Sequence, residues 1–201
     1  DTLRQALQTS RLRQVLRSEA GVVDAEFSPD GAQVATLDQA GRLRVWDAGT
    51  GQLLAEHSAG TAHGVRVRFS ADGRWLLTLV DGRAQLWAVD GFELAATLQQ
   101  EEDFDDAWLS VDGTRVLTLG AGRARLWRTG DERPLLTLNT VPARLARFSP
   151  DGQRVAVATD DRHLLIRKAD TGEPLADFEV TGDVLDLRWL PDQLQIMLYG
   201  F

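Results

Sequence analysis

Four copies of one short pattern decide the fold: FSPDG at 27–31, FSADG at 69–73, LSVDG at 109–113 and FSPDG at 148–152. A fifth and degenerate copy, WLPDQ, follows at 189–193. The first residues of successive copies are 42, 40, 39 and 41 positions apart. A spacing this regular indicates a repeat architecture in which each period forms one supersecondary unit.

A second anchor follows each of the first four copies. It reads VWD at 45–47, LWA at 86–88, LWR at 126–128 and IRK at 166–168. Its middle residue stands 18 or 19 positions after the first residue of the preceding copy. Two patterns that stay in phase over four periods exclude a chance resemblance.

Each period contains four short apolar runs separated by turn residues, which is the pattern of a small antiparallel sheet. In the first period we expect strands at about 22–27, 33–37, 42–46 and 52–56. The connections PDG, QAG and GTG suit tight hairpins, because glycine adopts positive φ and proline presets the turn. Sheets that are buried on both faces must pack against their neighbours, and a radial arrangement does this with only short free edges. The sequence therefore predicts an all-β protein in which one period is one blade of a β-propeller.

The period, the SPDG turn and the VWD strand end resemble those of WD-repeat β-propellers over residues 11–201. The resemblance implies four complete four-stranded antiparallel blades at about 22–57, 65–98, 106–138 and 143–178, and a partial fifth at 184–201. It also implies that 11–19 is an outer strand of a closing blade, and that 1–10 is a short helix or linker. Because propellers of this family generally have about seven blades, we expect the chain to be a segment of a larger propeller.

In WD-repeat propellers a His, an Asp, a Ser or Thr and the Trp of each blade form a hydrogen-bonded network, and the resemblance implies such a network here. The His position is occupied by other residues in every repeat. The Asp position retains Asp81 and Asp161 but holds Ala40 and Ala121 in the other two blades. We therefore expect less stable blades or looser loops than in a consensus propeller.

Composition excludes several classes of function. The chain has a net charge of −8, and nucleic-acid binding requires a basic face. It has no cysteine and three histidines, so we predict no metal site and no cofactor. No apolar run has the length of a membrane span and the first residues do not form a secretory signal, so we expect no membrane contact and a cytoplasmic location.

One candidate binding surface is an arc of basic residues. Arg42, Arg83, Arg123 and His163 each stand four positions before the Trp-equivalent residue, at the loop between the second and third strands. On successive blades they would line one rim, where arginine can bind carboxylate or phosphate groups. The alternative is that each is an ordinary solvated residue at the start of a strand.

A second candidate is the acidic loop of 101–106, which the fold would place on the same face. Glu101 and Asp105 flank Phe104, and Trp108 follows as the tryptophan most suited to exposure. An exposed aromatic residue within an acidic rim would capture a basic peptide. The alternative is a solubilising loop. Asp24, Arg66 and Asp106, three positions before successive anchors, favour salt bridges between adjacent inner strands over catalysis.

The sequence lacks a nucleophile with a base, and His57 and His63 read as ordinary loop residues. We therefore predict a non-catalytic scaffold or sensor that binds a protein or peptide partner through loops on one face. The segments TLRQAL at 2–7 and SRLRQVLR at 10–17 resemble the junction before WD repeats in bacterial signalling proteins with a STAND-type NTPase or similar effector. Two alternatives stay open: an enzymatic propeller such as a lactonase-like hydrolase, and a purely structural module that self-associates through open blade edges.

Overall fold

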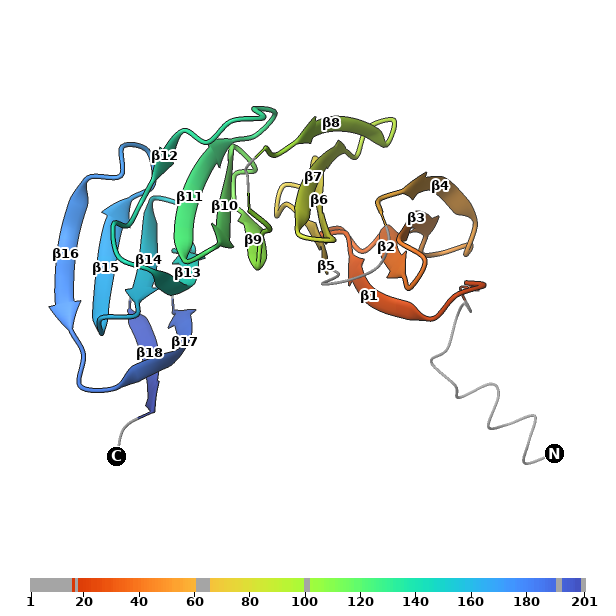
Figure 1. The fold of residues 1–201 in the computed structure, drawn as a ribbon. Coiled ribbons are helices and arrows are strands. Elements are labelled where there is room, and N and C mark those ends of the chain that lie inside the picture. The colour runs from red at the N-terminus through yellow and green to blue at the C-terminus, as the bar shows by residue number, and fades with distance from the viewer. Residues whose placement is uncertain (1–15, 17, 61–65, 100–101, 191–192, 200–201) are drawn as a thin grey trace.

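The structure is a computed structural model that describes residues 16, 18–60, 66–99, 102–190 and 193–199. Over these residues the chain forms eighteen strands in five antiparallel sheets, four with four strands and one with two (Figure 1). The prediction of four complete blades and a partial fifth is therefore confirmed. The predicted segments 1–10 and most of 11–19 lie outside the described residues.

The strands follow one another in the same order in every blade. Blade 1 contains β1 (Val22–Phe27), β2 (Gln33–Asp38), β3 (Arg42–Asp47) and β4 (Leu53–Ser58). Blade 2 contains β5 (Arg66–Phe69), β6 (Trp75–Val80), β7 (Arg83–Ala88) and β8 (Glu93–Thr97). Blade 3 contains β9 (Asp106–Leu109), β10 (Arg115–Gly120), β11 (Arg123–Arg128) and β12 (Leu136–Thr137). Blade 4 contains β13 (Ala143–Phe148), β14 (Arg154–Thr159), β15 (His163–Lys168) and β16 (Pro174–Glu179), and the partial blade 5 contains β17 (Asp183–Trp189) and β18 (Leu194–Tyr199).

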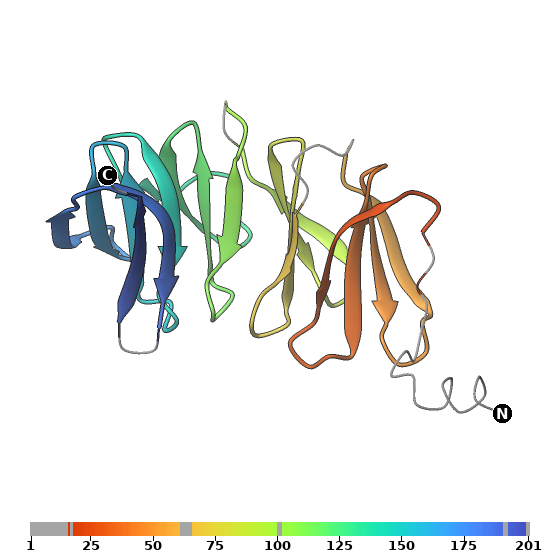
Figure 2. The ribbon, with the colours of Figure 1, turned by 90° about the horizontal axis from the view of Figure 1, so that it is seen from below.

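The blades stand side by side along an arc (Figures 1 and 2). The first strand of each blade lies on the concave side of the arc, and the fourth strands lie on the convex side (Figure 1). First strands of neighbouring blades contact one another, as β1 does β5 and β13 does β17. The concave side is therefore a wall built from every blade in turn.

The turn between the first and second strands is held by the residues that reveal the repeat. In blade 1 the Ser28 hydroxyl donates to Asp30 (2.6 Å) and accepts from the Gln33 amide (2.9 Å). The Gly31 amide donates to the Ser28 carbonyl (2.8 Å), with Gly31 at φ 70°, a conformation that favours glycine. The same Ser–Asp bond recurs in blades 2, 3 and 4, as Ser70–Asp72, Ser110–Asp112 and Ser149–Asp151. The FSPDG pattern thus specifies one turn four times.

The tryptophans of the second anchor are buried and hydrogen-bonded to the neighbouring second strand. In the first three blades the indole Nε1 donates to a threonine hydroxyl at 2.9–3.0 Å: Trp46 to Thr36, Trp87 to Thr78 and Trp127 to Thr118. Buried indoles and hydroxyls need such partners, because an unpaired polar group is costly in the core. The Ser/Thr–Trp part of the expected network is present wherever the Trp is present.

The acidic part of that network departs from expectation in blade 1. Ala40 occupies the expected position, but Asp38, two residues earlier, is buried and accepts from the amides of Ala40 (2.9 Å) and Arg42 (3.0 Å). Asp38 also pairs with buried Arg44 at 2.9 Å. Blade 1 therefore has an acidic residue that binds the amides of this loop, although the expected position holds Ala40.

The apolar core is divided into clusters that lie between blades. Trp127 of β11 is wholly buried and packs with Leu86 and Leu98 of blade 2, while Trp87 of β7 packs with Leu43 and Val45 of blade 1. Trp87 and Trp127 therefore each cover the face of the preceding blade. The interpretation of these tryptophans as packing residues is confirmed.

Candidate binding surfaces

The four basic residues predicted to form an arc are the first residues of β3, β7, β11 and β15. Arg83 and Arg123 are exposed, whereas Arg42 is half-buried and pairs with Glu19 at 3.1 Å. His163 Nδ1 lies 2.7 Å from Asp177, and this hydrogen bond raises the pKa of His163 above its usual value. Among the described residues, Arg83 and Arg123 therefore have no ion-pair partner, whereas Arg42 and His163 each already contact a carboxylate.

The acidic loop does not present its aromatic residue to solvent. Phe104 is 5% exposed and contacts Trp127 edge-to-face, with ring centroids 5.8 Å apart. Asp105 is exposed beside it, and Glu101 lies outside the described residues. The interpretation of Phe104 as a surface hot spot is wrong in this respect, because the ring fills the apolar space between blades 2 and 3.

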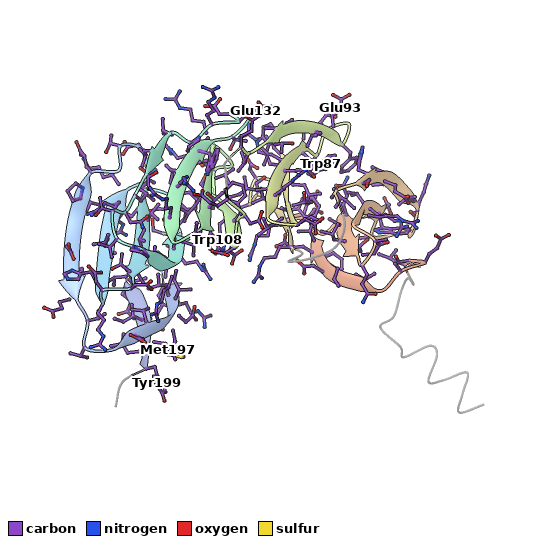
Figure 3. The ribbon with its side chains drawn as sticks, in the orientation of Figure 1. Trp87, Glu93, Trp108, Glu132, Met197 and Tyr199 are labelled. Carbon is purple, nitrogen blue, oxygen red and sulfur yellow. The ribbon has the colours of Figure 1, made fainter. Side chains whose placement is uncertain are left out.

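Trp108 is also buried, at 9% exposure, and the expectation that it is exposed is wrong. It packs in the apolar cluster between blades 3 and 4 (Figure 3), where the guanidinium of Arg147 from blade 4 stacks over its ring at 4.2 Å. Burial lowers the pKa of Arg147. A cation over an indole is favourable, and it covers the ring that the sequence alone leaves open.

Charged residues of the inner strands bridge neighbouring blades, as predicted. Arg66 lies 3.3 Å from Asp106, and Arg68 lies 3.7 Å from the same carboxylate, which joins blades 2 and 3. Between blades 1 and 2, Asp24 accepts from the amide of Val67 at 2.9 Å, and Glu26 accepts from that of Phe69 at 2.5 Å. The predicted salt bridge is therefore confirmed between blades 2 and 3, whereas between blades 1 and 2 the carboxylates accept backbone amides instead.

A hollow of about 640 Å³ opens where the inner strands of blades 1 to 4 end at their SPDG turns. This is the opposite end of the blades from the basic arc, because β1 and β2 meet there as Phe27 opposite Val34. The lining repeats by blade and is mostly apolar: Phe27, Phe69, Leu109 and Phe148 at one repeat position, and Pro29, Ala71, Val111 and Pro150 at another. The ring of Phe27 is 65% exposed in it.

The charged groups of the hollow are Glu26 and Arg147. Burial raises the pKa of Glu26, although the amide of Phe69 and the charge of Arg68 act in the opposite direction. The surface is therefore a mainly apolar concavity with one acidic and one basic group, which is the usual composition of a ligand or peptide site.

No protein-family model matches the sequence. Over 190 residues the chain is 26% identical to WD repeat-containing protein 1 of Gallus gallus and 24% identical to that of Mus musculus, covering 88% of this chain and 31% of each relative. The β-propeller domain of Swd1 from Myceliophteria thermophila superposes with a TM-score of 0.74 at 17% identity, over 92% of this chain and 64% of that one. The fold is that of a β-propeller, and the sequence is distantly similar to that of a WD-repeat protein. The chain spans about a third of the length of the curated relatives that it matches.

In a closed propeller, the inner strands of the blades surround a central channel. In the described part of this propeller, no three His, Asp or Glu side chains form a group that could hold a metal ion. Its described residues also contain no helix long and apolar enough to cross a membrane.

Sequence reasoning missed Glu26 and Arg147. Both stand one position before an anchor, and this position holds Glu26, Arg68, Trp108 and Arg147 in successive blades. An alignment of the repeats at this position would have shown charged and aromatic side chains on the first strands of successive blades. His57 was expected in a loop but lies in β4, with its ring 4.8 Å from that of Trp87, and His63 lies outside the described residues.

Proposed function

We propose that this propeller is a non-catalytic protein-interaction module that binds a peptide segment of its partner in the hollow at the turn end of blades 1 to 4. The observation that carries the proposal is the apolar lining of the hollow, in which Phe27 and Val111 are exposed. Exposed apolar groups in a concave surface favour association, since binding removes them from water.

The chemistry of the hollow defines the partner. Phe69 and Phe148 suit an apolar or aromatic side chain, and Arg147 and Glu26 provide one charge of each sign at the wall. An extended segment with an apolar anchor therefore fits this surface better than a highly charged one. The basic rim offers the rival surface, since Arg83 and Arg123 are exposed and would recognise an acidic segment.

The proposal includes the wider role predicted from the sequence, that of a sensor or scaffold in a larger bacterial signalling protein located in the cytoplasm. Support for that role comes from the resemblance of 2–7 and 10–17 to the segments before WD repeats in STAND-type proteins. Those residues lie outside the described part of the chain.

The test is a selection of peptides from a random display library on the immobilised chain, followed by calorimetric titration of the best binder. Two variants alter the hollow, Phe27→Asp and Val111→Asp, and two alter the rim, Arg83→Glu and Arg123→Glu. All four side chains are exposed, so the fold should tolerate each change. We expect the hollow variants to weaken binding by about tenfold or more and the rim variants to leave it unchanged.

The opposite pattern would assign binding to the rim and contradict the proposed site. If all four variants bound as the parent chain does, neither face would be the binding surface. A hydrolase screen on the same preparation addresses the enzymatic alternative, and reproducible turnover that survives further purification would contradict the non-catalytic role.

A further inference from the structure

Arg147 of β13 is a half-buried arginine that lines the hollow and has no ion-pair partner among the described residues. A guanidinium has five N–H donors. In the described part of the chain, the guanidinium of Arg147 makes one hydrogen bond, from Nη1 to the carbonyl of Ala146 at 2.8 Å. Buried Arg44, by contrast, lies 2.9 Å from Asp38 and 2.6 Å from Glu56. Arg147 therefore carries donors that the fold leaves unused.

The inner strands beside Arg147 do not neutralise its charge. Asp106 of β9 and Asp186 of β17 act on it from beyond ion-pair distance, and Asp106 lies 3.3 Å from Arg66 and 3.7 Å from Arg68. Burial lowers the pKa of Arg147, and the charges of Arg68 and Arg66 act in the same direction. Three arginines thus stand against two carboxylates on this part of the wall.

The neighbouring blades on both sides of Arg147 are part of the structure. Its strand β13 contacts β10 of blade 3 and β17 of blade 5. The inner strands that would supply a carboxylate to Arg147 are therefore in place, and the side chain stacks on an aromatic ring instead.

The ring of Trp108 fixes the orientation of this guanidinium. Trp108 is buried in the cluster between blades 3 and 4, and the guanidinium lies 4.2 Å from the centre of its ring (Figure 3). A guanidinium stacked on a ring keeps the N–H groups of its edge available for two parallel hydrogen bonds to a carboxylate or phosphate. Since Arg147 is held before a ligand arrives, binding requires little further ordering.

Glu26, the other charged group of the hollow, is less available to a ligand. Its carboxylate accepts from the amide of Phe69 at 2.5 Å, and burial raises its pKa. Around Arg147 the lining is apolar, with Leu109 and Phe148. The free charge of the hollow is thus positive and stands beside apolar side chains.

We propose that Arg147 is the anion-binding residue of the hollow, and that the partner segment carries one carboxylate or phosphate group beside its apolar anchor. The anionic group binds the guanidinium edge, and the apolar anchor packs on Phe148 and Leu109. This inference rests on the proposed function, because it names the chemistry of the segment that the hollow binds.

The probes are three small molecules that share one ring: phenylacetate, phenylacetamide and phenyl phosphate. Each is titrated into the isotope-labelled 201-residue chain while nuclear magnetic resonance follows the Nε–H signal of Arg147 and the indole signal of Trp108. We expect phenylacetate to bind at least about tenfold more tightly than the neutral amide, because hydrogen bonds between charged groups are stronger. Phenyl phosphate identifies the source of the anion: tighter binding than phenylacetate assigns a phosphate, and weaker binding assigns a carboxylate.

Two variants that each remove one arginine locate the site. Arg147→Gln should reduce the preference for phenylacetate over the amide to less than about twofold. Arg83→Gln, at the opposite end of the blades, should leave the preference unchanged. The indole signal of buried Trp127 reports whether each variant is folded. If Arg147→Gln does not fold, the signals that shift in the parent chain decide the location.

Equal binding of phenylacetate and phenylacetamide would overturn the proposal. A preference that survives in folded Arg147→Gln, or shifts confined to Arg83 and Arg123, would also overturn it. Failure of the proposed function gives a different result, in which no library peptide binds the hollow although the probes select Arg147. A library peptide that binds the hollow, together with probes that show no preference, would leave the proposed function standing and remove the anion site.

Discussion

The interface between blades 2 and 3 differs from that between blades 4 and 5. In the first, Trp127 is wholly buried over Leu98, and the second strand β10 is covered on both sides. In the second, Phe178 is largely exposed beside the two-stranded blade 5. Apolar residues face both interfaces. Whether the face of a blade is buried therefore depends on the third strand of the neighbouring blade and not on the residues of the blade itself.

We expect the largest loss of stability from substitution of Trp127, which is wholly buried between blades 2 and 3. Trp127→Ala should lower the free energy of unfolding by about 3–5 kcal/mol, because it removes a wholly buried ring and leaves the Thr118 hydroxyl without its partner. Urea denaturation followed by circular dichroism measures the loss. A cost below about 1 kcal/mol would mean that the neighbouring blades do not depend on Trp127.

Leu138 and Phe178 occupy the same register position in blades 3 and 4, so substitutions at these two residues compare the two interfaces directly. Leu138→Ala should cost about 2–5 kcal/mol, whereas Phe178→Ala, although it removes a larger side chain, should cost less than about 1 kcal/mol because the ring is mostly in water. The same denaturation assay compares the two. Equal costs would contradict the view that Phe178 is exposed in solution.

We expect the smallest effect on stability at the Ser–Asp turns. All four complete blades have this turn, whereas blade 5 has Leu190 at the serine position. The hydrogen bond from Ser149 lowers the pKa of Asp151, and a serine hydroxyl also helps to lower those of Asp30, Asp72 and Asp112. A folded-state pKa below the unfolded value of about 3.9 stabilises the fold above that pH, and this stability is lost as the pH falls through the folded pKa.

Asp151→Asn should therefore reduce the loss of stability on acidification below about pH 4. Thermal unfolding of the parent chain and the variant between neutral and acidic pH measures this difference. An Asp151→Asn profile parallel to that of the parent chain would count against the assigned turn.

The sequence predicts the blades because their information is local and repeated. Ser28, Asp30 and Gly31 stand within one turn, and each Trp bonds a Thr nine or ten residues away. The surface was predicted less well, because the exposure of a side chain depends on residues far from it in the sequence. Arg147 covers Trp108 from the next blade, and Trp127 covers Phe104 across an interface, so neither burial can be read from one repeat.

Hydrogen exchange of the chain alone shows directly whether the second strand of each blade is paired on one side or on both. The account predicts slow exchange at the amides of β6 and β10, which pair on both sides, and exchange at β18 faster on the order of a hundredfold. Similar protection of β18 and β10 would contradict the open interface between blades 4 and 5.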